Sequence, residues 1–162
     1  MDSSDIALLV LRVVFGVVLA LHGYNKISNG LDGTARWFES IGMRWPRLQA
    51  AVAAGVEIGA GIAFAIGLLT PLASAAIIGV MIVAYWVDHR GKGLFIFNGG
   101  WEYVLSIIVV AFAVSIAGPG RFSIDHALGI DVDGLGFGVG VAAVGVLSAA
   151  GQLALSYRPP RP

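Results

Sequence analysis

One carboxylate, Glu57, lies near the middle of a stretch of apolar and small residues that runs from Leu48 to Leu69. As a helix, a stretch of about 20 such residues crosses the roughly 30 Å hydrocarbon core of a bilayer. A charged carboxylate at that depth costs about 3 kcal/mol or more unless it is paired, protonated or hydrated. Ionisable groups within spans commonly belong to functional sites, so Glu57 is the first candidate site residue.

Three basic side chains, Arg12, His22 and Lys26, fall within the first apolar stretch. At 100° per residue they share one face of a helix, and the same face carries Gly16, Leu19 and Gly23. Counting about 1.5 Å per residue, Arg12 and Glu57 differ in depth by roughly 7 Å, which predicts a buried ion pair between them. Lys26 is either a snorkelling anchor at the helix end or the partner of Glu102 or Asp88.

A second group of polar residues gathers at the corresponding ends of three spans. It contains His22, Lys26, Asp88, His89 and Glu102, and it is flanked by Tyr24, Tyr85 and Phe95. Imidazoles, an amine and carboxylates beside aromatic rings could bind a quinone or move protons. Glu102 also has a simpler interpretation as an acid that favours the start of a helix. Haem ligation by His22 and His89 is a disfavoured alternative, and no spacing indicates a metal site.

Composition points to an integral membrane protein. Of the 162 residues, 57% are hydrophobic and 12% are charged, and the mean hydropathy is +0.85. The chain contains no cysteine, which excludes disulfides and iron–sulfur clusters held by cysteine. The net charge is zero, and no basic run is present that could follow a nucleic-acid backbone.

The hydrophobic pattern predicts an all-α protein with four spans in residues 1–134 and a fifth at 135–157. The first four are expected at 6–27, 48–69, 71–87 and 101–117. Small residues on two faces of the 48–69 helix predict that it is a central helix of the bundle. A short interfacial helix is expected at 34–41, and a second one, capped by Ser123, ends near Gly129. Residues 158–162 are expected to form a disordered tail.

The basic residues predict the orientation. With five spans, one side of the membrane receives eight of the ten lysines and arginines: Lys26, Arg36, Arg44, Arg47, Arg90, Lys92, Arg158 and Arg161. Arg121 falls on the other side, and Arg12 lies within the first span. The positive-inside rule then places the N-terminus outside and the C-terminus in the cytoplasm.

Several blocks of sequence, in order, resemble the DoxX family of small membrane proteins. They are His22-Gly23-Tyr24-Asn25-Lys26-Ile27 after Arg12, ARWFESIG, VEIGAGIAFAIGLLTPLAS, GLFIFNGGWEYVLSI after His89, and GPGRFSID, over roughly residues 8–126. The resemblance implies a four-helix membrane bundle with characteristic residues at Arg12, Glu57, His89, Glu102, Arg121 and Asp125. The apolar stretch after Leu135 is an addition to that pattern.

The resemblance implies a multi-pass protein of a bacterial plasma membrane, related to subunits of thiosulfate:quinone oxidoreductase and to proteins of oxidative or thiol stress responses. Our interpretation is a small subunit that is part of, or accessory to, a quinone-linked oxidoreductase system. Two alternatives remain open from the residues: a structural subunit that packs into a larger membrane complex or a homo-oligomer, and a pathway for protons or small solutes. Beyond the lipid bilayer, the partners are expected to be membrane proteins and not nucleic acid.

Overall fold

The computed structural model describes residues 2–159 and is built from helices. Within these residues the α-helices are α1 (Ser3–Ser28), α2 (Leu31–Ser40), α3 (Pro46–Ile66), α4 (Thr70–Ala84), α5 (Glu102–Ala117), α6 (Ile124–Ala127) and α7 (Leu135–Ser156). A π-helical turn, Tyr85–His89, extends α4, and a 3-10 turn, Ile96–Asn98, precedes α5.

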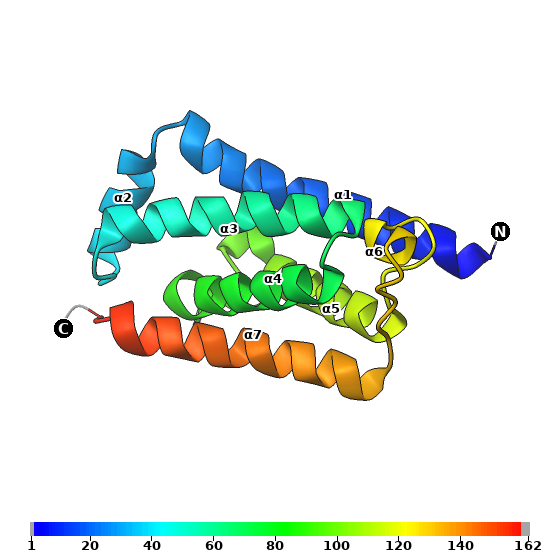
Figure 1. Ribbon diagram of the computed structural model, residues 1–162. Coiled ribbons are helices and arrows are strands. Elements are labelled where there is room, and N and C mark those ends of the chain that lie inside the picture. The colour runs from blue at the N-terminus through cyan, green and yellow to red at the C-terminus, as the bar shows by residue number, and fades with distance from the viewer. Residues whose placement is uncertain (1, 160–162) are drawn as a thin grey trace.

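The long helices lie side by side and form a bundle (Figure 1). In the described part of the chain, four stretches are long and apolar enough to cross a membrane: Ser3–Ser28, Pro46–Ile66, Thr70–His89 and Leu135–Ser156. Helix α5 is apolar but shorter, with 16 residues. The predicted all-α membrane fold is therefore confirmed, including the additional C-terminal helix.

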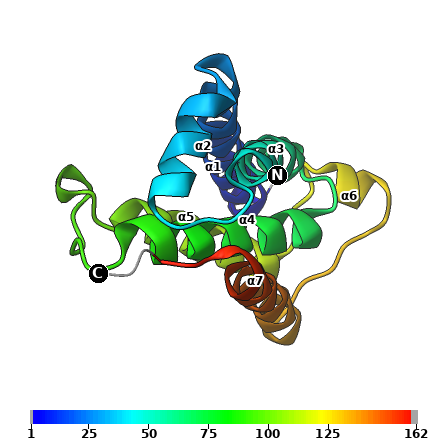
Figure 2. The same ribbon diagram turned by 90° about the vertical axis from the view of Figure 1, so that its left-hand side faces the viewer.

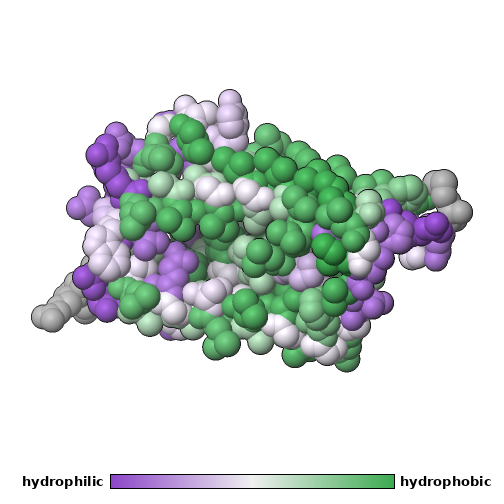
Figure 3. Space-filling model, viewed as in Figure 1, coloured by the Kyte–Doolittle hydropathy of each residue, from purple (hydrophilic) through white to green (hydrophobic). Residues whose placement is uncertain are grey.

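The bundle has two ends with different contents. The N-terminal residues and α6 lie at one end, here called the α6 end, and α2 and the last described residues lie at the other, the α2 end (Figure 1). The surface between the ends is mostly hydrophobic, and hydrophilic residues gather at the ends (Figure 3). This distribution is expected for helices surrounded by lipid.

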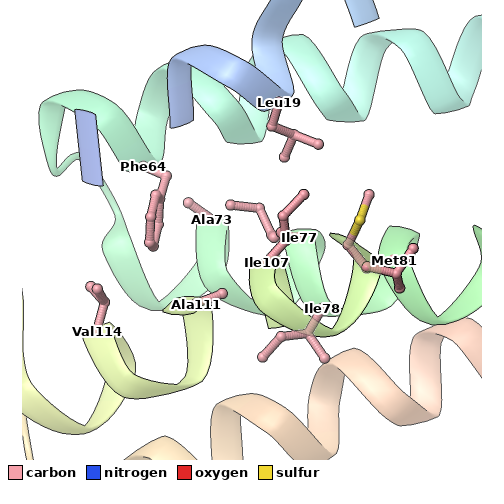
Figure 4. Close-up of a cluster of buried hydrophobic side chains, with 10 residues drawn as sticks. Leu19, Phe64, Ala73, Ile77, Ile78, Met81, Ile107, Ala111 and Val114 are labelled. Atoms are coloured by element: carbon pink, nitrogen blue, oxygen red, sulfur yellow. The ribbon is translucent and has the colours of Figure 1, made fainter. Parts of the chain in front are cut away.

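Helix α4 is the most buried of the spans and contacts α3, α5 and α7. Seen along the bundle, α1 and α3 lie to one side of α4 and α7 lies to the other (Figure 2). The main hydrophobic cluster joins Leu19, Phe64, Ala73, Ile77, Ile78, Met81, Val104, Ile107, Ala111 and Val114, with four residues each from α4 and α5 (Figure 4). Helix α4 is thus central to the bundle, and α3, which the small residues predicted to be a central helix, contacts α1, α2 and α4.

Only one face of small residues on α3 is used inside the protein. Gly61 lies against Gly16 of α1 so closely that a Cβ at Gly16 would lie 2.5 Å from the Gly61 carbonyl oxygen. Gly55 and Gly59, which were expected to pack on a second neighbour, have open space around them. Close backbone approach through glycine is typical of helix pairs in membranes.

This contrast between buried and open glycines predicts opposite effects of alanine. Gly16→Ala is expected to lower the free energy of unfolding by about 1–3 kcal/mol, because the added methyl group overpacks the α1–α3 contact. Gly59→Ala is the matched control, and it should leave stability unchanged or raise it by up to about 1 kcal/mol through helix propensity. Denaturant unfolding in mild detergent measures both, and equal effects would contradict the α1–α3 packing.

The α2 end is closed by contacts between the α2–α3 turn and the end of α7. Met43 and Tyr157 form an isolated bridge, Arg44 N donates to Ser156 O at 2.7 Å, and Arg158 N donates to Gly42 O at 2.7 Å. The prediction of a disordered tail is therefore wrong for Arg158, because its backbone is paired with the turn. Residues 160–162 of that predicted tail lie outside the described residues.

Both predicted short helices are present, and the second starts at its predicted cap. Helix α2 begins three residues before the expected start and buries Ala35 and Phe38 against Met43 and Ala50. Asp32 at its start accepts a hydrogen bond from Arg47 at 2.7 Å, which lowers the pKa of the Asp32 carboxyl. Helix α6 is capped as predicted, with Ser123 Oγ accepting from His126 N at 3.1 Å.

Candidate functional site: a polar cluster in an apolar cavity

A cavity of about 530 Å³ lies in the half of the bundle nearer the α2 end. Its walls come from α1, α2, α3, α4, the π-turn, α5 and α7, and most of them are apolar side chains. Polar side chains in the lining include the ionisable residues His22, Lys26, Glu57, Asp88, His89 and Tyr103, and also Ser148 and Gln152. This size, with a small number of polar groups in apolar walls, is typical of sites for small organic molecules.

The central feature of the cavity is an ion pair between Lys26 and Glu57. Lys26 lies in the last turn of α1, and Glu57 lies near the middle of α3 with 6% of its surface exposed. Gly23 brings the two helices together beside the pair, since a Cβ there would lie 2.9 Å from the Cβ of Glu57. The charge of the buried Glu57 carboxylate is therefore compensated by Lys26 of the neighbouring helix α1.

The predicted pairing of Arg12 with Glu57 is wrong. Arg12 is fully buried at the α6 end, where its Nη2 donates to Phe122 O at 2.6 Å. Its guanidinium also lies beside Gly67 and within the field of the Asp125 carboxylate. The antiparallel register of α1 and α3 places Arg12 opposite the last turn of α3, beyond the reach of Glu57.

The predicted pairing of Lys26 with Asp88 or Glu102 is also wrong. Asp88 Oδ1 accepts from Lys92 Nζ at 2.6 Å, one turn further along the chain. Glu102 Oε1 accepts from the backbone N–H of Ile96 at 2.7 Å and thereby holds the loop before α5. Glu102 therefore has a local structural role, consistent with the simpler interpretation of an acid at a helix start.

A π-turn places Asp88 and His89 at the cavity. Arg90 N donates to Tyr85 O, five residues earlier, at 2.9 Å, and such turns occur frequently at functional sites. His89 Nδ1 is 2.7 Å from Gly99 O, and its Nε2 is 3.7 Å from Asp88 Oδ2. The carbonyl oxygen of Gly99 holds the ring by accepting from Nδ1–H, and the Asp88 carboxylate lies beside Nε2.

Tyr103 on α5 was missed by the sequence analysis. Its ring lies 5.3 Å from the ring of His22, and it lines the same cavity as Glu57. Its hydroxyl is buried without a hydrogen-bond partner among the described residues. A tyrosine in the first turn of an otherwise apolar span, beside Glu102, is the signal that could have identified it.

Three of the aromatic residues expected at the site lie elsewhere. Tyr24 is 61% exposed on the outside of α1, Tyr85 packs edge-on against Trp101, and Phe95 stacks on Phe97 in an exposed loop. Their places at the cavity are taken by Trp37, Phe38 and Met43 from the α2 region. His22, Asp88 and His89 are the members of the predicted set that line the cavity, together with Lys26 and Glu57.

Arg12 and Asp125 form a separate polar centre at the α6 end. Asp125 is fully buried, and its two carboxylate oxygens accept from Leu69 N and Thr70 N, each at 2.7 Å. These N–H groups belong to the start of α4, so a side chain distant in sequence caps this helix. This centre fixes the α3–α4 turn and contributes nothing to the walls of the cavity.

The described residues contain no cluster of three or more His, Asp or Glu side chains arranged to hold a metal ion. His22 contacts the ring of Tyr103, and His89 is held by Gly99. The chemistry that the cavity offers is hydrogen bonding, charge and proton transfer.

Comparison with known proteins gives a family and two relatives. Residues 7–90 match the model of the DoxX family. The chain is 28% identical over 113 residues to "Putative oxidoreductase CatD" of Bacillus subtilis, a match that covers 70% of this chain and 81% of that protein. It is 31% identical over 133 residues to "Inner membrane protein YphA" of Escherichia coli, covering 76% of this chain and 91% of that protein. No solved structure matches.

Proposed function

The chain belongs to the DoxX family of membrane proteins, and we propose that it binds a quinone-type molecule in the cavity as a small subunit of a membrane-associated oxidoreductase system. The observation that carries the proposal is the cavity itself, where an ion pair, two imidazoles and a tyrosine hydroxyl with no partner in the described part of the chain face apolar walls. The name of the relative from Bacillus subtilis supports an oxidoreductase setting.

The polar groups suit the two carbonyl oxygens of a quinone. Lys26 and the Tyr103 hydroxyl are hydrogen-bond donors, and the apolar walls hold the ring. Reduction of a quinone to a quinol takes up two electrons and two protons. His22, Lys26 and Glu57 line the same cavity and are the groups we propose as proton donors to the ring.

The chain has no cysteine that could carry electrons, and we propose that another protein supplies them. We therefore place the chain beside a redox partner in a bacterial plasma membrane, with the α2 end toward the cytoplasm as the basic residues indicate. The direct test is purification of the tagged protein from its native membrane in mild detergent. Bound quinone with a stoichiometric oxidoreductase is the expected result, and a quinone-free preparation that fails to bind added quinone would reject the proposal.

The variant Tyr103→Phe is expected to weaken quinone binding without lowering the stability of the fold. We expect quinone affinity to fall about tenfold, because a neutral hydrogen bond contributes about 0.5–1.5 kcal/mol. Thermal stability should stay within about 0.5 kcal/mol, since the hydroxyl has no partner among the described residues to lose. Tyr24→Phe is the control, because Tyr24 is exposed and outside the cavity. Loss of stability in Tyr103→Phe without a change in affinity would assign Tyr103 a structural role.

A second candidate function, a packing subunit of a larger membrane complex or homo-oligomer, is favoured by the open glycines of α3. Gly55 and Gly59 lie one turn apart with free space in front of them, and such faces allow helices to approach closely in lipid. Because the chain has no cysteine, a single Gly59→Cys variant reports contacts by crosslinking in native membranes. A specific crosslinked product would support this role, and Gly140→Cys on the open face of α7 is the control.

A further inference from the structure

The cavity extends beyond the polar side chains on one side. Beyond Glu57 it continues between α3 and α7, with α4 as its floor. The α3 wall is formed by Val52, Ala53 and Val56, and the α7 wall by Ser148, Ala149 and Gln152. Val52 and Ser148 both line the cavity and are exposed at the surface of the bundle, so the cavity reaches the lateral surface between these two helices.

On the side of the cavity away from α7, α1 packs on α5, and the rings of His22 and Tyr103 lie 5.3 Å apart. Helices α3 and α7 instead lie on two sides of α4, and a side-chain hydrogen bond between Gln152 Nε2 and Gln49 Oε1, at 2.9 Å, joins them near the α2 end. The groove between α3 and α7 therefore leads from the cavity sideways into the region of the lipid chains.

The residues along the groove are small or branched apolar side chains. Ala53, Ala76, Gly79 and Ala149 keep it open, and Val56 and Val80 line the passage toward Glu57. Two polar side chains interrupt this surface, and both are hydrogen-bonded within the protein: Ser148 donates to Gly145 O of its own helix, and Gln152 donates to Gln49. The rest of the surface offers van der Waals contact, which suits a flexible hydrocarbon chain and disfavours a second polar group.

We propose that the groove between α3 and α7 holds the hydrocarbon tail of the bound molecule and is the portal through which this molecule enters from the bilayer. This inference rests on the proposed function, and it narrows the ligand class to quinones with a long apolar substituent. The polar ring lies at Lys26, Glu57 and Tyr103, and the tail runs past Val56 and Val52 to the lipid.

The test compares two probes that share a ring, decylubiquinone and the same benzoquinone without the decyl chain. Binding is measured by titration of the purified full chain in lipid nanodiscs, with quinone concentrations expressed relative to lipid. Val52→Trp narrows the portal at an exposed position, where a larger side chain is compatible with folding. Leu48→Trp is the control, since Leu48 is exposed on the same helix and does not line the cavity.

We expect the decyl probe to bind at least tenfold more tightly than the probe without a tail. Val52→Trp should weaken decyl binding about tenfold with an unchanged affinity for the tailless ring, Val52→Leu should have an intermediate effect, and Leu48→Trp should have none. Equal binding of both probes, or insensitivity of decyl binding to Val52→Trp, would overturn the portal and leave the quinone site intact. If neither probe binds to the unmodified chain, the proposed function fails together with the portal.

Discussion

Replacing Lys26 by methionine is expected to lower the free energy of unfolding by about 3 kcal/mol, because Glu57 is left as an unpaired carboxylate inside the bundle. Glu57→Gln should be milder, at about 1 kcal/mol. Lys26 lies in the last turn of α1 with 24% of its side chain exposed, so it can turn toward the interface when its partner is neutral. The Glu57 side chain, at 8% exposed, has no such route.

The double variant Lys26→Met with Glu57→Gln is the control, and its stability should return to that of Glu57→Gln alone. Equilibrium unfolding in mild detergent at neutral pH gives all three values. The same preparations should lose quinone binding in every case, because each change removes a donor or a proton carrier from the cavity. If Lys26→Met is as stable as the unmodified chain, then Glu57 is neutral in the folded protein and the ion-pair interpretation is wrong.

Asp125→Asn is expected to have the largest effect on stability, about 3–5 kcal/mol. The asparagine can accept one of the two hydrogen bonds from Leu69 N and Thr70 N, but its amide group opposes the other. The change also leaves the fully buried guanidinium of Arg12 without a compensating charge. The lost helix cap and the uncompensated buried charge both destabilise the α3–α4 turn.

Asp131→Asn is the matched control for this prediction. Asp131 pairs with His126 at 2.9 Å, but both side chains are largely exposed, and exposed pairs contribute about 0–1 kcal/mol. Hydrogen exchange should show faster exchange at Leu69 and Thr70 in Asp125→Asn only. Normal protection of these two amides in that variant would show that the cap does not hold the start of α4.

The sequence was sufficient for the features that depend on local pattern. Apolar length predicted five long helices, the stripe of Arg12, Gly16, Leu19 and Gly23 is the buried face of α1, and the cap at Ser123 is present. Each of these follows from spacing along one element. The boundaries moved by a few residues because Trp45 and Leu69 adopt left-handed conformations before Pro46 and Thr70, which no propensity signals.

The pairing of charges could not be predicted, because it depends on which helices touch and in which register. The acidic residue near Arg12 is Asp125, 113 positions away in the chain, and not Glu57. Arg12 also donates to a backbone oxygen, that of Phe122, and the sequence does not reveal this contact. The position of Glu57 opposite Gly23 follows from the glycine contacts between α1 and α3. The place of Asp88 and His89 depends on the π-turn, whose extra residue rotates both side chains relative to a regular α-helix.

The contacts between the α2–α3 turn and the end of α7 also constrain the order in which parts of the fold can form during synthesis. Gln152 is synthesised 103 residues after Gln49, which corresponds to about 5–20 s of translation. During that interval the turn at Gly42 to Arg44 has no partner from α7, and the face of α4 around Ile78 and Gly79 is uncovered. One wall of the cavity is therefore absent until the last helix is inserted, so the cavity is complete only at the end of biogenesis.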